Sequence, residues 1–151
     1  MTTPAAFVQR FEETWAAPSL ERLDALTNPD VCYVQPLLPE VRGRAAAGTY
    51  WRRVFTLMPD LHIDVVNSAV SADNMVYIEF LIRGTLGGRP VRWPAIDRYE
   101  LDELERVRRR ILYCDSAQLA PSLLRPRGMA ALLGAVVRLG FSAVRSRWRY
   151  R

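Results

Sequence analysis

The sequence predicts one small α+β domain, in which helices come first and an antiparallel sheet follows. Apolar residues recur at helical spacing in the first third of the chain, and from Leu61 onward their period changes to two. Short segments rich in Gly, Asn and Asp separate the period-two stretches. A run of helices followed by a run of strands is typical of α+β folds and not of parallel α/β folds. The length of 151 residues fits a single domain with its own core.

Two helices are expected within residues 4–27, with a break at Ala17-Pro18-Ser19, where Ser19 can cap the second helix. Asn28-Pro29-Asp30 is expected to stop that helix. A short strand is then expected at residues 31–35, and a third helix at residues 44–57.

Four further strands are expected at residues 61–71, 75–84, 90–101 and 106–115. The segments between them are Ala72-Asp73-Asn74, Gly87-Gly88 and residues 102–105. Because these connections are short enough for hairpins, consecutive strands should pair antiparallel as a meander.

The strand at residues 90–101 carries a single charge, Asp97, on an otherwise apolar face. That face reads Val91, Trp93, Ala95, Asp97, Tyr99 and Leu101. A desolvated Asp97 has a raised pKa and can donate a hydrogen bond as a neutral acid, or it stays ionised if Arg110 on the next strand reaches it. The alternative is an Asp–Arg pair that only organises the wall of a pocket.

The last part of the chain is expected to form a proline-punctuated connector and an amphipathic helix over residues 129–150. Arg138, Arg145 and Arg149 form a basic stripe beside apolar residues of this helix. Three roles remain open: a lid over the domain, part of a homodimer seam, or a contact of residues 128–151 with an anionic membrane surface.

Charge and composition exclude several classes of protein. The net charge of +5 is matched by five Arg in the last fourteen residues, and no nucleic-acid-binding motif accompanies them, so no nucleic-acid partner is expected. No long uncharged apolar stretch and no secretory leader pattern appear, which favours a cytoplasmic protein, either free or peripheral to a membrane. Cys32 and Cys114 lie in apolar runs without metal-ligand spacing, and no phosphate-binding loop is present, so neither metal nor cofactor is expected.

Three segments resemble SnoaL-like proteins of the nuclear transport factor 2-like superfamily: residues 58–66, 96–103 and 111–119. The similarity extends over about residues 5–120, so a domain over residues 1–120 and an extension over residues 121–151 are expected. The resemblance implies a cone-shaped, curved antiparallel sheet whose N-terminal helices enclose an apolar pocket, and often a homodimer.

The resemblance also places catalytic positions of related enzymes on this chain. Asp97 falls where ketosteroid isomerases keep a protonated Asp in the oxyanion hole, whereas Gln35 and Phe11 replace the general base and the oxyanion Tyr. Leu112 stands where polyketide cyclases and limonene epoxide hydrolase-like enzymes are expected to carry an acid/base Asp. His62, the only histidine, would be an obvious general base, but the alternation of its strand favours a partly exposed sheet face for it.

The sequence therefore predicts a pocket for a small apolar ligand, with Asp97 as the catalytic candidate. The residues expected to line it are Phe11, Trp15, Gln35, Ile78, Phe80, Trp93, Tyr99, Arg110, Leu112 and Cys114, and Tyr33, Tyr50 and Trp51 are expected at its border. One hypothesis is a cofactor-independent isomerase, cyclase or hydratase acting on a carbonyl-bearing substrate, with Gln35 orienting it. The alternative is a non-catalytic ligand-binding or dimeric scaffold protein, associated with a membrane surface through the C-terminal helix.

Overall fold

The computed structural model describes residues 4–73 and 75–115. Its elements are α1 (Pro4–Ala16), α2 (Leu20–Ala25), β1 (Thr27–Val34), β2 (Val41–Arg42), α3 (Arg44–Leu57), β3 (His62–Val70), β4 (Val76–Leu86), β5 (Arg89–Leu101) and β6 (Val107–Cys114). The connector and basic helix expected after residue 120 lie outside the described residues. None of the described helices is long and apolar enough to cross a membrane.

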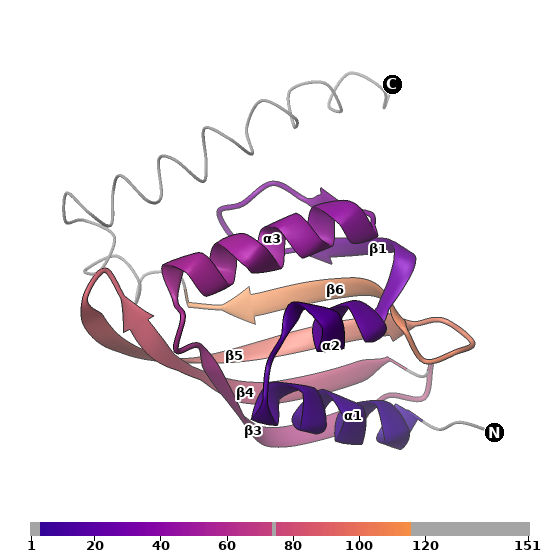
Figure 1. Cartoon of the computed structure of the whole chain (residues 1–151). Coiled ribbons are helices and arrows are strands. Elements are labelled where there is room, and N and C mark those ends of the chain that lie inside the picture. The colour runs from indigo at the N-terminus through magenta and orange to yellow at the C-terminus, as the bar shows by residue number, and fades with distance from the viewer. Residues whose placement is uncertain (1–3, 74, 116–151) are drawn as a thin grey trace.

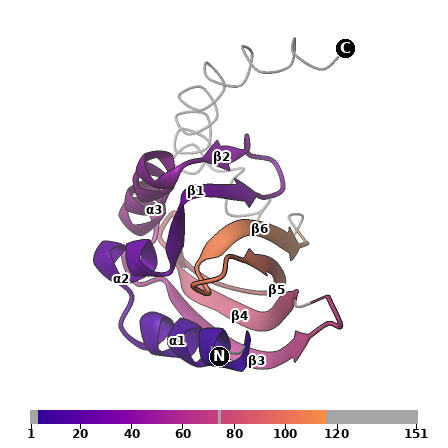
Figure 2. The same cartoon turned by 90° about the vertical axis from the view of Figure 1, so that its right-hand side faces the viewer.

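One curved six-stranded sheet forms the body of the domain, in the order β2-β1-β6-β5-β4-β3. Helices α1, α2 and α3 all lie along the same face of this sheet (Figure 1). Seen from its end, the sheet curls around the side on which the helices lie (Figure 2). It does not close into a barrel, because β2 and β3 remain as its two edges.

The prediction of an antiparallel sheet is correct for the meander from β3 to β6 but wrong for the sheet as a whole. Strand β1 pairs parallel with β6, which makes the sheet mixed. Hairpin connections fix the directions of β3 to β6, whereas β1 meets β6 across most of the chain. No local signal in the sequence sets the direction of such a long-range pair.

Strand β1 begins at Thr27, which corrects the expectation that Asn28-Pro29-Asp30 lies between a helix and a strand. The pairing of β1 with β6 is interrupted between Thr27 and Cys32, so Pro29 sits where no ladder hydrogen bond is required of it. Ser19 caps α2 as predicted: its hydroxyl oxygen accepts from the Arg22 amide at 3.2 Å.

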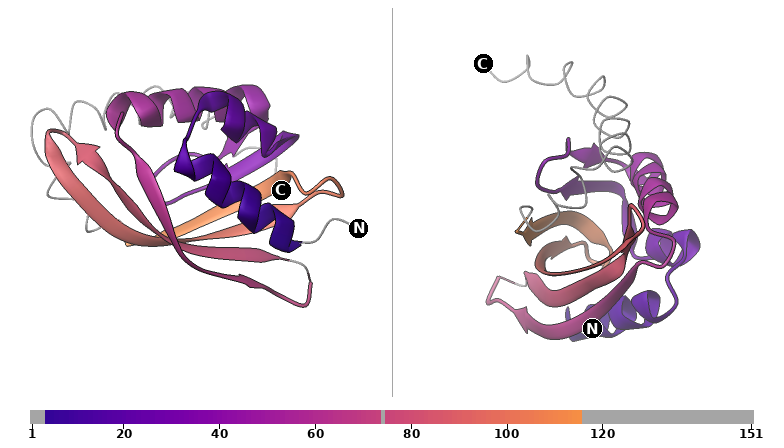
Figure 3. Two further views of the ribbon diagram at one scale, coloured as in Figure 1. Left: turned by 60° about the horizontal axis from the view of Figure 1, so that its bottom comes forward. Right: turned by 90° about the vertical axis from the view of Figure 1, so that its left-hand side faces the viewer.

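The concave face of the sheet and the three helices enclose the core. Four alternate side chains of β4 are buried, as their apolar spacing predicts: Val76, Ile78, Phe80 and Ile82. Irregular pairing between Val65 and Asn67 in β3, and between Glu100 and Leu101 in β5, adds local twist to the sheet. The twisted strands then wrap α1 and α3 from one side (Figure 3).

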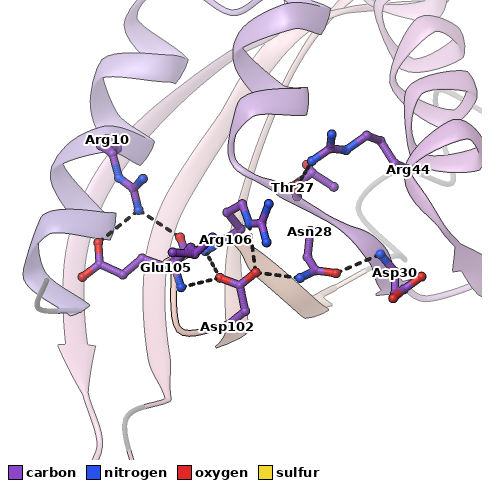
Figure 4. A network of polar contacts seen from close by, with 9 residues as sticks. Arg10, Thr27, Asn28, Asp30, Arg44, Asp102, Glu105 and Arg106 are labelled. Atoms are coloured by element: carbon purple, nitrogen blue, oxygen red, sulfur yellow. Dashed lines mark hydrogen bonds and ion pairs between the residues drawn. The ribbon is translucent and has the colours of Figure 1, made fainter.

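A polar network, which we call the hairpin network, holds the turn between β5 and β6 against the helices (Figure 4). Asp102 is its centre. One carboxylate oxygen accepts from the Leu104 and Arg106 amides at 2.9 and 2.8 Å, and the other accepts from Asn28 Nδ2 at 2.6 Å and Arg106 Nε at 2.9 Å. Both oxygens of Asp102 are therefore satisfied by atoms of the protein.

The hairpin network also reaches α1. Arg10 donates to both the backbone oxygen and the carboxylate of Glu105, at 2.9 and 3.1 Å. The backbone amide of Val107 donates to the Leu26 oxygen at 2.8 Å, just beyond α2. These contacts tie α1, the α2–β1 connection and the β5–β6 turn into one end of the domain.

Candidate functional site: a buried aspartate and arginine pair

Three neighbouring strands place one residue each in a row on the concave face. Arg110 of β6 is aligned with Tyr33 of β1 on one side and with Tyr99 of β5 on the other. Asp97 lies two residues from Tyr99 on β5, and therefore on the same face. The register of the sheet thus brings Asp97 diagonally beside Arg110.

Asp97 and Arg110 form a buried ion pair. One carboxylate oxygen of Asp97, Oδ2, accepts from Arg110 Nε at 2.7 Å and from the Tyr99 hydroxyl at 2.6 Å. The side chains of Asp97 and Arg110 are only 1% and 7% exposed. Both charges are removed from water, so each needs the other as its partner. Removal of one would leave the other as an unpaired buried charge, which is strongly destabilising.

Aromatic rings surround the guanidinium group of Arg110. Its central carbon lies 5.8 Å from the centre of the Tyr33 ring and 5.5 Å from that of Trp51. These distances are within the range of cation–π contacts, which strengthen as water is excluded. Rigid rings and the ion pair together hold Arg110 in one position.

Burial and the charge of Arg110 shift the pKa of Asp97 in opposite directions. Burial raises the pKa of Asp97, and the Arg110 charge and the hydrogen bonds from Arg110 and Tyr99 only partly offset this rise. Burial, followed by the neighbouring carboxylate, raises the pKa of Tyr99 well above its usual value. Tyr99 is therefore a hydrogen-bond donor to Asp97 throughout the neutral range, and Arg110 keeps its positive charge.

A small cavity of about 30 Å³ adjoins the ion pair. Its lining residues come from α1, α2, β1, α3, β5 and β6: Phe7, Phe11, Trp15, Leu23, Leu26, Thr27, Tyr33, Trp51, Asp97, Tyr99, Val107 and Arg110. Helix α1 contributes Phe7, Phe11 and Trp15 at four-residue spacing, which places them on one face of the helix. The enclosed volume is that of a small polar group or a water molecule.

Three residues that line this cavity each carry an unused polar atom. Among the described residues, nothing forms a hydrogen bond with Asp97 Oδ1, Arg110 Nη1 or Trp15 Nε1, although each of these atoms is buried. A buried polar atom without a partner costs about 1–3 kcal/mol, so such groups call for water or a ligand. The cavity therefore offers one acceptor and two donors to an occupant.

A second, smaller cavity of about 10 Å³ lies between α2 and α3. Its lining residues are Leu20, Leu23, Asp24, Thr27, Ala47, Gly48 and Trp51. Leu23, Thr27 and Trp51 line both cavities, so the two cavities adjoin at these side chains.

The structure brings five of the predicted site residues to the Asp97 cavity: Phe11, Trp15, Asp97, Tyr99 and Arg110. Ile78, Phe80 and Trp93 are buried in the core and do not line it. Leu112 and Cys114 instead line a separate groove of about 500 Å³ with Pro36, Glu79, Pro94, Ala95, Ile96, Tyr113 and Asp115.

Gln35 follows β1 and is buried, but it does not line the Asp97 cavity. Neither amide atom of its side chain has a hydrogen-bond partner within the part of the chain that the structure describes. His62 lies at the start of β3, half exposed, with Nε2 at 2.8 Å from Asp64 Oδ1. Within residues 4–73 and 75–115, His, Cys, Asp and Glu form no group of three that could hold a metal ion.

Sequence reasoning missed several members of the cavity wall, among them Phe7, Leu23, Thr27 and Val107. The helical spacing of Phe7 ahead of Phe11 was a sufficient signal for that residue. Thr27 and Val107 reach the wall because β1 aligns with β6 at this point, Thr27 opposite Val107. That pairing is parallel and joins residues far apart in the chain, so no local sequence pattern predicts it.

Comparison with known proteins gives the family. The SnoaL-like domain matches residues 8–110, more than half of the chain. This chain belongs to the SnoaL-like domain family. No curated protein shows significant similarity to it.

Solved structures share the fold of this SnoaL-like domain at low sequence identity. An NTF2-like protein of unknown function from Burkholderia pseudomallei K96243 has a TM-score of 0.73 and 16% identity, over 83% of this chain and all of the other. A hypothetical protein with a ketosteroid isomerase-like fold from Catenulispora acidiphila DSM 44928, in complex with trimethylamine, has a TM-score of 0.69 and 23% identity. That match covers 82% of this chain and 96% of the other.

An LEH-like epoxide hydrolase from M. tuberculosis has a TM-score of 0.66 and 20% identity, over 87% of this chain and 95% of the other. At these identities the matches establish the fold alone.

Proposed function

We propose that this SnoaL-like domain binds a small ligand whose hydrogen-bonding head enters the Asp97 cavity. The observation that carries the proposal is the set of unused polar atoms on the cavity wall: Asp97 Oδ1, Arg110 Nη1 and Trp15 Nε1 have no hydrogen-bond partner among the described residues. Buried polar atoms without partners beside an otherwise apolar cavity call for an occupant that can form hydrogen bonds with them.

Binding is favoured over proton abstraction by the identity of the groups around Asp97. Its carboxylate contacts Arg110 and Tyr99, which hold it as a counter-ion and a hydrogen-bond acceptor. His62, a possible base, faces Asp64 on the half-exposed start of β3. Leu112, aligned with Asp97 on the neighbouring strand, has no proton to exchange.

A second candidate is a cofactor-independent isomerase, cyclase or hydratase acting on a carbonyl-bearing substrate. The raised pKa of Asp97 favours it, because a carboxylic acid kept neutral by burial can donate a hydrogen bond to a developing oxyanion. In that case substrate would displace Arg110 from Oδ2, and turnover would depend on the protonated form of Asp97.

The test is an NMR titration of the indole N–H of Trp15 with propanamide, which carries a donor, an acceptor and a short apolar chain. Trp15→Phe assigns the resonance. We expect a saturable downfield shift in the wild type and in the control variant His62→Gln, and loss of saturation in Asp97→Ala. Absence of a saturable shift in the folded wild type would disprove binding at this cavity.

Asp97→Ala can fail to fold, since it leaves Arg110 as an unpaired buried cation. Tyr99→Phe provides a second variant, because it keeps the ion pair and removes only the hydroxyl that donates to Oδ2. We expect Tyr99→Phe to bind propanamide with an altered dissociation constant. Turnover of a carbonyl or epoxide substrate that stops in Tyr99→Phe would favour the enzymatic candidate.

We also propose a homodimer that buries the outer face of the sheet. Ile96 of β5 and Tyr113 of β6 are aligned on the outer face of the sheet, line the separate groove, and are 42% and 51% exposed. Large apolar side chains grouped in this way favour a protein contact. Light scattering should give the mass of a dimer for the wild type and of a monomer for Ile96→Asp.

A further inference from the structure

We propose that the ligand is a neutral amphiphile, with an amide or hydroxyl head at Asp97 and Arg110 and a thin unbranched chain that passes between α2 and α3. This inference rests on the proposed function and adds the chemical class of the ligand and its direction in the site. The unused polar atoms indicate the head group, and the second cavity indicates the path of the chain.

The unused atoms define the head group. Asp97 Oδ1 requires a donor, whereas Arg110 Nη1 and Trp15 Nε1 require an acceptor, and nothing in the described part of the chain satisfies them. One group that both donates and accepts, such as a hydroxyl or a primary amide, meets this pattern. A ketone or an ether accepts only and would leave Asp97 Oδ1 unpaired.

The charge of the site selects a neutral head. Asp97 and Arg110 already neutralise each other at 2.7 Å, and their side chains are at most 7% exposed. A carboxylate entering the cavity would lose its hydration and meet Asp97 Oδ1, a like charge. An ammonium group would meet the Arg110 guanidinium in the same way.

The volume requires the rest of the ligand to leave the cavity. About 30 Å³ holds the head and little more. The cavity between α2 and α3 is the adjoining space, since it shares Leu23, Thr27 and Trp51 with the Asp97 cavity. A chain that displaces Leu23 from this shared wall would run from the ion pair to the seam while Trp51 stays against Arg110.

The seam itself is suited to a thin apolar chain. Helix α3 presents Ala47 and Gly48 to it, and α2 presents Leu20 and Leu23. A Cβ atom added at Gly48 would have its nearest neighbour, Arg52 Nη1, at 3.7 Å, an ordinary contact. Gly48 therefore keeps this part of the seam open where a larger side chain would fit.

Helix α2 is the shortest of the walls. It has six residues, fewer than an isolated helix needs for stability in water, so packing holds it in place. The ligand chain would enter beside Leu23 and leave strand pairing intact.

The experiment compares head groups at constant chain length and chain lengths at constant head group. Hexanamide, hexan-1-ol and hexanoate are titrated into the full chain, with the Trp15 indole N–H as the readout. We expect saturable binding of the first two and at least about tenfold weaker binding of hexanoate, the effect of one uncompensated buried charge. Equal binding of hexanoate would overturn the neutral head.

Gly48→Leu tests the path of the chain, because it fills the seam without weakening α3: Leu favours a helix more than Gly does. We expect Gly48→Leu to weaken hexanamide binding about tenfold or more, because the leucine side chain occupies the space that the ligand chain needs. Formamide has no chain, so its binding should be the same as in the wild type. The matched control is Ala46→Leu on the exposed side of α3.

The outcomes separate this inference from the proposed function. If neither formamide nor hexanamide perturbs Trp15, the proposed function fails. If both bind and Gly48→Leu affects them equally, or affects neither, the site stands and the path through the seam is wrong.

Discussion

Asp97 and Asp102 belong to the same β5–β6 hairpin, and the protein treats them in opposite ways. Asp102 is 12% exposed in its side chain, and both of its oxygens accept hydrogen bonds from the turn, Asn28 and Arg106. Asp97 is 1% exposed, and one of its oxygens has no partner among the described residues. A satisfied carboxylate stabilises the fold, whereas a buried one with unused capacity marks a place for an occupant.

The pKa values of the two aspartates express the same difference. Partial burial by itself would raise the pKa of Asp102, but hydrogen bonds from the Arg106 and Leu104 amides, Asn28 and the Arg106 side chain lower it to about 2. For Asp97, burial is the larger effect and the pKa is raised. The two carboxyl groups therefore make opposite contributions to the pH dependence of stability.

The largest effect is expected from Asp97→Ala, which leaves the Arg110 charge buried without a partner. The free energy of unfolding should fall by about 3–5 kcal/mol. Urea denaturation of the wild type and the variant at pH 7 measures it. The double variant Asp97→Leu, Arg110→Met should recover most of the loss, because it removes both charges; a single variant that costs less than about 1 kcal/mol would contradict a desolvated pair.

Asp102→Ala is expected to cost about 2 kcal/mol at pH 7, the linkage value of a pKa lowered from 3.8 to about 2. Because the folded pKa lies below the unfolded one, this stability is present above pH 3.8 and is lost as the pH falls toward 2. The difference between variant and wild type, measured by urea denaturation, should therefore shrink between pH 5 and pH 2. A difference that stays constant with pH would show that lost packing and not charge is responsible.

Tyr99→Phe is expected to cost about 1.5 kcal/mol, the lower end of the effect of a lost hydrogen bond to a charged group. It should also raise the pKa of Asp97 further, because the hydroxyl favours the ionised carboxylate. Since the folded pKa of Asp97 exceeds its unfolded value, stability from its protonation is present at low pH and is lost as the pH rises through the folded pKa. Carboxyl ¹³C NMR of Asp97 in both proteins measures the shift, and an unchanged or lower pKa would contradict it.

The smallest effect is expected from Arg10→Gln in the hairpin network. The Arg10 side chain is 40% exposed, so its ion pair with Glu105 is screened by water and should contribute about 0.2–1 kcal/mol. Raising the salt concentration should reduce the difference from the wild type. A loss above about 2 kcal/mol would mean that the hydrogen bond from Arg10 to the Glu105 backbone holds the turn.

Sequence alone determined most of the secondary structure, and it also identified five residues of the Asp97 cavity: Phe11, Trp15, Asp97, Tyr99 and Arg110. Apolar periodicity and hairpin turns located the helices and the β3–β6 meander, because both signals act between residues close in the chain. The alternation around Asp97 also identified it as the one charge on the core-facing side of β5, and its burial agrees. A single charge on an apolar strand face can be recognised from the alternation along the strand, whatever the register in which the strand pairs.

Tertiary structure decided everything that depends on long-range pairing. The parallel alignment of β1 with β6 places Tyr33 beside Arg110 and brings Thr27 into the cavity wall, and no neighbouring residue in the chain encodes it. The positions of Gln35 and Leu112 away from Asp97's cavity, and the seam at Gly48, follow from the same packing. Pattern fixes which face a side chain takes, but only the packed sheet and helices fix which buried polar atoms find partners and which remain for a ligand.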